Sequence, residues 1–461
     1  MLNKPVIVLV LALSFLLGSV SVAAQAEVAP TLPDNVPGLL IKANEAYAAQ
    51  DYLGYSKVLE RLREMRPNNS EYMYQLVIAY ALTNNKPKAY ELMLSMQQQG
   101  LAYDFSLADT TRNIRGTEVF DYVNDLMKMA GSPIGESELV FTLPESLKAP
   151  EAIAWDASRG VYLVGTSIDG SIVSVTPEGE TKKLLEANSE NGMWAVFDLL
   201  VDQPRNRLWV SSASIPGFSG FDPIDTGRSG LFEFNLETLE LIHHYPVPVD
   251  GRPHILGKMV INKEGDIFIA DRLYPFLFKK PANEQKIKAV MVLRNMISMR
   301  GIAMQPDGRI MYLADREMGI MVVDIEAGRT GALQLPANFN PGGIDGLYLW
   351  ENRLVIIQNG IKPQRVMRLQ LDASGTRVES VRPLAVAQPG FDHPSFGTIK
   401  GEDLIYFANS QVVNGIVNSQ PVSVFSTPLD SSADLAVPDL EKYFMKRGEK
   451  QEAERAKKDK N

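Results

Sequence analysis

The residues best placed to do chemistry are charged side chains that open short apolar segments. Glu151, Arg300 and Asp345 each stand directly before such a segment. Glu151 and Asp345 offer carboxylate oxygens, whereas an arginine is a permanent cation with no acceptor atom and a fork of donors that suits carboxylates. If the three segments lie side by side, Arg300 neutralises Glu151 and Asp345 across a narrow space. We therefore predict a charged site built around these three residues.

Two further charged residues, Asp198 and Lys258, open segments of the same kind. A shift of register by one residue would bring them into the same ring instead. His393 precedes another such segment and is a candidate acid or base at the mouth of the site. The competing interpretation is that His393 is a solvated loop histidine, and we expect the same for His254, which follows a proline in a loop.

The stretch 299–325 shows the plan that positions these residues. It consists of three short runs rich in aliphatic and β-branched residues, which predict strands. The first run ends at Pro306-Asp307-Gly308, where proline presets φ for a turn and glycine accepts a positive φ. The second and third runs are separated by the polar break at 315–317.

Related units begin near residues 151, 198, 258, 345 and 396. Six units at roughly 45-residue spacing are typical of a radial array of four-stranded sheets, since one such sheet cannot bury both of its faces alone. We predict a six-bladed β-propeller over residues 137–430, in which the first side chains of the inner strands converge on the axis. We expect residues 137–142 to add an outer strand to the last blade and close the ring.

Residues 37–130 change to helical spacing, and short polar breaks separate helix-length segments. Offsets of 34 residues relate Tyr55 to Ala89 and Leu59 to Met93, and this pattern resembles the tetratricopeptide repeat. The alternative is a plain helical bundle. The fold class is thus multidomain, α then all-β, with residues 131–136 as the linker because glycine and proline disfavour continuing a helix.

The ends of the chain have their own signals. Lys4, an apolar run at 6–17 and Ala24-Gln25-Ala26 indicate a cleavable signal peptide at 1–26, and the competing interpretation is a membrane anchor. We expect a periplasmic or secreted protein with no membrane span in the mature chain. Residues 440–461 are dense in lysine, arginine and glutamate and predict a charged tail.

Composition excludes several function classes. The 461 residues are 45% hydrophobic, enough for two domains, and the net charge of −9 argues against nucleic acid as a partner. No cysteine occurs, so disulfides, thiolate metal sites and a cysteine nucleophile are excluded. The sequence contains no Gly-x-Ser-x-Gly elbow, so it gives no support for Ser-His-Asp catalysis.

The segments that begin at Glu151, at Arg300 and at Asp345 resemble the gluconolactonase and regucalcin family of six-bladed propellers. The resemblance implies a divalent cation on the axis, held by a Glu that opens the first blade, an Asn that opens a middle blade and an Asp that opens the next, in a site that opens lactones. Glu151 matches that Glu and Asp345 matches that Asp. Where the family has Asn before Gly-Leu-Ala, this chain has Arg300 before Gly-Ile-Ala.

Two functions follow from this departure. In the first, Arg300 stands where the cation would be, so the protein is an exported binding or scaffold protein without a cofactor. Its helical repeat would bind a protein partner in a groove, and its propeller axis would bind a small molecule. The alternative is a metal-dependent lactone or ester hydrolase. Glu151 and Asp345 would then hold a divalent cation such as calcium, Asp198 would add a ligand oxygen, and Arg300 would swing aside to orient a substrate carboxylate.

Overall fold

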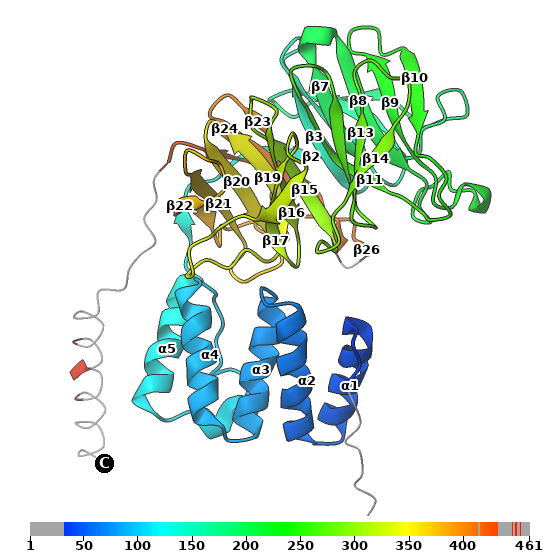
Figure 1. The fold of residues 1–461 in the computed structure, drawn as a ribbon. Coiled ribbons are helices and arrows are strands. Elements are labelled where there is room, and N and C mark those ends of the chain that lie inside the picture. The colour runs from blue at the N-terminus through cyan, green and yellow to red at the C-terminus, as the bar shows by residue number, and fades with distance from the viewer. Residues whose placement is uncertain (1–31, 414, 432–444, 446–447, 450–451, 453–461) are drawn as a thin grey trace, which may run out of the picture.

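The computed structural model describes residues 32–413 and 415–431, together with 445, 448–449 and 452. It has an N-terminal helical part and a β part with six sheets of four or five strands (Figure 1). The predicted signal peptide and most of the predicted charged tail lie outside these residues. Within them, the helices are too short or too polar to cross a membrane.

Five α-helices follow one another in the helical part: α1 (Val36–Ala48), α2 (Tyr52–Met65), α3 (Ser70–Leu82), α4 (Lys86–Gln98) and α5 (Glu118–Ala130). Each begins after a residue whose side chain accepts a hydrogen bond from a free backbone N–H of the first turn. These caps are Asn35, Asp51, Asn69, Asn85 and Thr117. The starts of α1 and α3, and those of α2 and α4, are both 34 residues apart.

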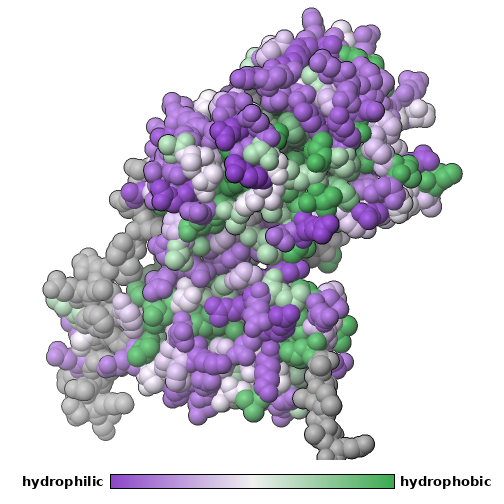
Figure 2. Space-filling model, viewed as in Figure 1, coloured by the Kyte–Doolittle hydropathy of each residue, from purple (hydrophilic) through white to green (hydrophobic). Residues whose placement is uncertain are grey.

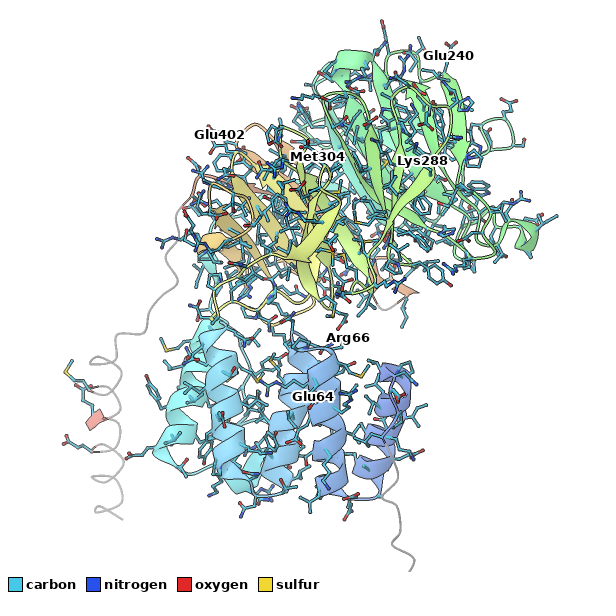
Figure 3. The ribbon with its side chains drawn as sticks, viewed as in Figure 1. Glu64, Arg66, Glu240, Lys288, Met304 and Glu402 are labelled. Atoms are coloured by element: carbon cyan, nitrogen blue, oxygen red, sulfur yellow. The ribbon has the colours of Figure 1, made fainter. Side chains whose placement is uncertain are left out.

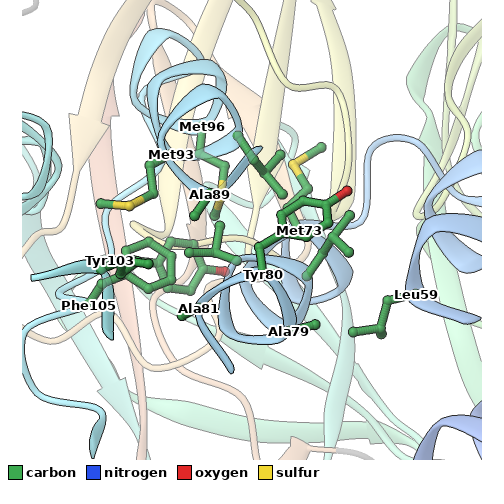
Figure 4. Close-up of a cluster of buried hydrophobic side chains, with 14 of the residues drawn as sticks. Leu59, Met73, Ala79, Tyr80, Ala81, Ala89, Met93, Met96, Tyr103 and Phe105 are labelled. Carbon is green, nitrogen blue, oxygen red and sulfur yellow. The ribbon is translucent and has the colours of Figure 1, made fainter. Parts of the chain in front are cut away.

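The segment after α4 completes the core of the helices. Tyr103 and Phe105 stack on Tyr74 of α3 with ring centroids 5.0 and 5.1 Å away, and Figure 4 shows both rings beside the buried side chains of α3 and α4. A 3₁₀-helix (Asp109–Ile114) then packs against α3. Because α3 is covered on several sides, it carries apolar residues around most of its circumference.

The β part contains six sheets, numbered here in chain order. The first three are β3 (Pro150–Asp156), β4 (Val161–Thr166), β5 (Ile172–Val175) and β6 (Thr181–Leu185); β7 (Ala195–Asp202), β8 (Arg207–Ala213), β9 (Ser229–Asn235) and β10 (Leu241–Pro246); and β11 (Leu256–Ile261), β12 (Ile267–Asp271), β13 (Phe276–Lys280) and β14 (Lys288–Val292).

The fourth sheet holds β15 (Met299–Met304), β16 (Ile310–Asp315), β17 (Gly319–Asp324) and β18 (Arg329–Ala332). The fifth holds β19 (Ile344–Trp350), β20 (Arg353–Gln358), β21 (Arg365–Leu371), β22 (Val378–Val386) and β1 (Ile134–Gly135). The sixth holds β23 (Gly397–Lys400), β24 (Asp403–Phe407), β27 (Val422–Pro428) and β2 (Glu138–Leu143). A small hairpin, β25 (Val412–Val413) with β26 (Ile416–Val417), projects from the sixth sheet.

The sheets form a closed ring. Each inner strand lies beside the inner strand of the next sheet, and β23 of the last sheet lies beside β3 of the first. The six-bladed propeller is therefore confirmed. So is the predicted closing strand, since β2 pairs with β27 from Glu138 opposite Ser426 to Leu143 opposite Val422. Part of the predicted linker is itself a strand, because Ile134 and Gly135 pair with the outer edge of β22.

The helices rest on loops of the fourth and fifth sheets (Figure 1). In the turn between α2 and α3, Asn69 Nδ2 donates to Glu317 Oε2 at 3.1 Å. At the end of α4, Gln99 Oε1 accepts from Asn340 Nδ2 at 2.8 Å. These loops lie at the end of the sheets where the inner strands begin, so the helices cover part of that face. Figure 2 shows that the visible surface of both parts is largely hydrophilic, with smaller hydrophobic patches among the hydrophilic residues.

Candidate functional site

The inner strands bring their first residues to the axis through a shared irregularity. Each of β3, β7, β11, β15 and β19 has a register shift near its start, which is the mark of a β-bulge. In β3, β15 and β19 the unpaired residues at the shift are Glu151, Arg300 and Asp345. A bulge redirects the side chain of the extra residue. The three predicted residues therefore converge on the axis.

Asp198 and Lys258 also lie at the axis, because the Lys258 amine contacts both Asp198 and the backbone oxygen of Glu151. The residues predicted for the shifted register and those predicted for the first register therefore share one site. The amine of Lys258 donates to the carboxylate of Asp198 at 2.8 Å, and Met259 N donates to its second oxygen at 2.9 Å. The Lys258 amine also lies 4.1 Å from the ring centre of Phe396. Burial raises the pKa of Asp198 above its ordinary value despite these donors.

Glu151 has a partner that the sequence did not indicate. Arg272 Nη1 donates to Glu151 Oε2 at 2.9 Å, and the Arg272 guanidinium lies 4.8 Å from the ring centre of Phe197. Among the described residues, Arg300 forms no ion pair with Glu151. The predicted pairing of these two residues is therefore wrong. Arg272, in the loop after β12, forms the ion pair with the Glu151 carboxylate instead.

Asp345 is held by three groups. Arg316 Nη1 lies 3.1 Å from Asp345 Oδ1, Asn359 Nδ2 donates to Oδ2 at 2.8 Å, and Arg300 Nε lies 3.9 Å from Oδ1. Burial by itself would raise the pKa of this carboxyl, but Arg300, Arg316 and the Asn359 amide together outweigh burial and hold its pKa below the ordinary value. The predicted pair between Arg300 and Asp345 thus forms, but at 3.9 Å, whereas the pair between Arg316 and Asp345 is closer at 3.1 Å.

Arg300 is the least satisfied cation of the site. Its Nε donates to Ser298 Oγ at 3.2 Å, and within the described chain its terminal nitrogens have no hydrogen-bond acceptor. The side chain is 26% exposed. Burial, and then the charge of Arg272, lower its pKa.

The site as a whole carries more positive than negative charge. Its cations are Lys258, Arg272, Arg300 and Arg316. Its carboxylates are Glu151, Asp198 and Asp345. The formal net charge is therefore +1, and each carboxylate already has a cation as partner. The described residues also include no group of three or more histidines and carboxylates arranged to hold a metal ion.

The axis is closed at the site and open beyond it. A small void lined by Phe197, Gly257, Arg272 and Phe396 adjoins Lys258 and Arg300 and has no room for a water molecule. On the other side of Lys258 and Arg300 a channel of about 470 Å³ follows the inner strands toward the face away from the helices. The floor of this channel is therefore formed by Asp198, Lys258 and Arg300.

The two candidate histidines lie away from this floor. His393 is among the half-exposed side chains, forms a 2.9 Å pair with Asp392 Oδ1 and does not line the channel. His254 is 3% exposed, so the prediction of a solvated position is wrong. Its Nδ1 lies 2.6 Å from Asp271 Oδ2 and its Nε2 lies 3.1 Å from Asp250 Oδ1, which fixes a loop of the third sheet.

Arg272 and Arg316 were missed, although the sequence carries a signal for them. Both end the motif Ala-Asp-Arg, at 270–272 after β12 and at 314–316 after β16. The aspartate of each motif is fully buried; Asp315, for example, accepts from the backbone N–H groups of Ser298 and Glu317 at 2.7 and 2.8 Å. Each aspartate fixes the loop that aims the following arginine at the axis.

Comparisons with known proteins identify similar folds only. No protein-family model matches the sequence, and no curated protein matches it. A luciferin-regenerating enzyme shares 13% identity at a TM-score of 0.46, and the match covers 66% of this chain and 98% of that one.

Two further structural neighbours belong to the family named from the sequence. The calcium-binding protein regucalcin from Agrobacterium tumefaciens strain C58 shares 13% identity at a TM-score of 0.45, over 64% of this chain and 95% of that one. A protein described as a putative gluconolactonase shares 11% identity at a TM-score of 0.43, over 65% of this chain and 93% of that one. The structural neighbours of this propeller therefore include gluconolactonase and regucalcin proteins.

Proposed function

We propose that this protein is a binding protein whose propeller axis takes a small anion in place of a metal ion. The observation that carries the proposal is the pairing of every axial carboxylate with a cation of the same chain. Glu151 is held by Arg272, Asp198 by Lys258, and Asp345 by Arg316. With Arg300 added, the site has a formal net charge of +1.

A divalent cation would find few free ligands here. Calcium takes about six to eight oxygen ligands, mostly from carboxylates and carbonyls. To bind at this site it would have to displace Arg272 or Arg316 from its carboxylate and come close to Arg300, which has no acceptor atom. The excess positive charge instead favours an anion, which would accept from the free donors of Arg300.

The test combines metal content, stability and activity of the purified protein. We expect no stoichiometric calcium or zinc, no rise in melting temperature with micromolar calcium, and no hydrolysis of simple lactones. Arg300→Asn restores the ligand type that the resembling family has at this position, and Arg309→Asn, on an exposed turn of the same sheet, is its matched control. If the wild-type protein binds calcium and opens lactones, the hydrolase takes the place of this proposal.

Export and a protein partner complete the proposed function. The apolar run at 6–17 followed by Ala24-Gln25-Ala26 supports export, which N-terminal sequencing of the mature protein tests. The 34-residue offset between helix pairs supports a repeat surface for a segment of another protein. A pull-down that recovers the same partners with and without residues 37–130 counts against that surface.

A further inference from the structure

We propose that the channel binds a short peptide-like monocarboxylate, with its carboxylate on Arg300 and its body extended along the inner strands. This inference rests on the proposed function, because it takes the axis to be free of metal. It adds the class of ligand and the side from which the ligand enters. Three independent features of the channel carry it.

The first feature is the charge at the floor. The terminal nitrogens of Arg300 have no hydrogen-bond acceptor among the described residues, and its nearest carboxylate oxygen, on Asp345, is 3.9 Å from Nε. An arginine fork of this kind suits a carboxylate with two oxygens. Because the net charge of the site is +1, one negative charge balances it. A dianion would face the carboxylate of Asp198, which also lines the channel.

The second feature is the backbone of the wall. Each of the six inner strands, β3, β7, β11, β15, β19 and β23, stands at the edge of its sheet and pairs on one side only. The other edge faces the axis, and its N–H and C=O groups are outside the sheet ladder. Side chains already bind some of them, since Asp198 accepts from Met259 N and Tyr348 accepts from Gly397 N. A ligand with amide groups can hydrogen-bond to such an edge, as extended peptides do when they add to a sheet. A purely aliphatic ligand would leave these groups without partners.

The third feature is the set of side chains between the edges. Most are apolar, and those that are only partly buried include Val260, Met304, Leu349 and Ile399. The hydroxyl of Tyr348 is already engaged, because it accepts from Gly397 N at 2.5 Å. These side chains offer few hydrogen-bond partners to a sugar with many hydroxyls but can bury apolar side groups. The volume of about 470 Å³ lies within the range of small-molecule sites.

The direction of entry follows from the closed end of the channel. On the side of the helices, the void beside Arg272 and Phe396 admits no water molecule, so a ligand cannot pass there. The open end lies where the inner strands finish, beside Met304, which Figure 3 shows on the side of the propeller away from the helices. The ligand therefore enters with its carboxylate first.

Calorimetric titration of the full chain with acetyl-Ala-Leu tests the proposal. We expect the free acid to bind and its C-terminal amide to bind roughly tenfold to hundredfold more weakly, because the charged hydrogen bonds to Arg300 are lost. Arg300→Gln should weaken binding of the acid by a similar factor. Arg309→Gln, on an exposed turn of the same sheet, should leave it unchanged.

A second pair of variants keeps the test independent of changes at the floor. Met304→Glu places a like charge at the mouth and should weaken binding of the acid, whereas Met304→Leu should not. The proposal is overturned if the acid and the amide bind equally, or if decanoate binds more tightly than the acetylated dipeptide. It is also overturned if the titration with acetyl-Ala-Leu gives no heat of binding. If one of these overturning results is obtained with a protein that holds no metal and hydrolyses no lactone, the proposed function still stands. Calcium binding by the wild type would instead remove the proposed function itself.

Discussion

Arg316 lies 3.1 Å from Asp345, although the two residues belong to different sheets. Arg316 stands in the loop after β16, and the next residue, Glu317, accepts a hydrogen bond from Asn69 in the turn between α2 and α3. Met318 O in the same loop accepts from Asn68. The helices thus hold the loop that carries one of the cations on Asp345, which links the helical part to the axial site through three consecutive residues.

Replacing Arg316 by alanine should destabilise the propeller. The side chain of Asp345 is 12% exposed, and it would keep only the Asn359 amide and the more distant Arg300. We expect a loss of about 1 to 3 kcal/mol in the free energy of unfolding, as for a buried charged group that loses a donor. Urea unfolding measures it. Arg309→Ala removes an exposed pair with Asp324 and should cost clearly less than Arg316→Ala; equal losses in both variants contradict the prediction.

The two arginines nearest the floor should differ in their contribution to stability. Arg272 forms a direct pair with Glu151, whose side chain is 10% exposed, so Arg272→Ala leaves that carboxylate without its cation. We expect a cost of about 3 to 5 kcal/mol, as for a broken buried pair. Arg300→Ala should cost clearly less, since no carboxylate depends on Arg300 alone. Thermal unfolding of both variants decides the order, and the reverse order would show that Arg300 is the main partner of the ring.

Acid should remove the stabilising contribution of Asp345. Its pKa in the folded state is lowered below the ordinary value of 3.8, so the unfolded chain takes up the proton first as the pH falls. The contribution is therefore complete above about pH 5 and disappears as the pH falls through the folded-state pKa. Unfolding free energies of the wild type and Asp345→Asn should differ at pH 7 and converge below pH 4. A constant difference across this range contradicts the prediction.

Asp198 should have the opposite pH dependence. Burial raises its pKa in the folded state above the ordinary value of 3.8, so between these two values the folded chain binds the proton more tightly. Stability contributed by this group falls as the pH rises through that window. Relative to Asp198→Asn, the wild type should therefore gain stability on acidification from pH 7. A titration of this carboxyl by NMR with a midpoint below 3.8 would contradict the assignment.

Arg365 should connect the helices to the propeller. It is 3% exposed, its Nε donates to Gln358 Oε1 at 2.7 Å, and its Nη1 donates to the backbone oxygen of Gln99 at 3.3 Å. Burial lowers its pKa to about 10. Arg365→Ala should leave these acceptors unpaired and speed hydrogen exchange of the amides at 99–102. Arg353→Ala, which removes a partly exposed pair with Glu351, serves as the control and should leave that exchange unchanged.

The sequence by itself determined the architecture of this protein. Six related units with turn signals define six sheets around an axis, and the helical spacing of residues 37–130 sets the helices apart, because both patterns depend on local periodicity. The closing strand was also foreseeable, since residues 137–142 have strand character but no neighbour of their own. Local patterns of this kind also indicated that Glu151, Arg300 and Asp345 lie at the starts of inner strands.

Only the tertiary structure decided which charges meet. Bulges at the starts of three inner strands turn Glu151, Arg300 and Asp345 to the axis, and a bulge depends on the partner strand rather than on local sequence. Asp198 and Lys258 meet there as a 2.8 Å pair. Arg272 and Arg316 reach the axis from loops after the second strands, each fixed by a buried aspartate. Ion pairs are chosen by distances of a few ångströms between elements far apart in the chain. For that reason the sequence indicated a charged axis, whereas the structure assigned Glu151 to Arg272 and left the terminal nitrogens of Arg300 without an acceptor among the described residues.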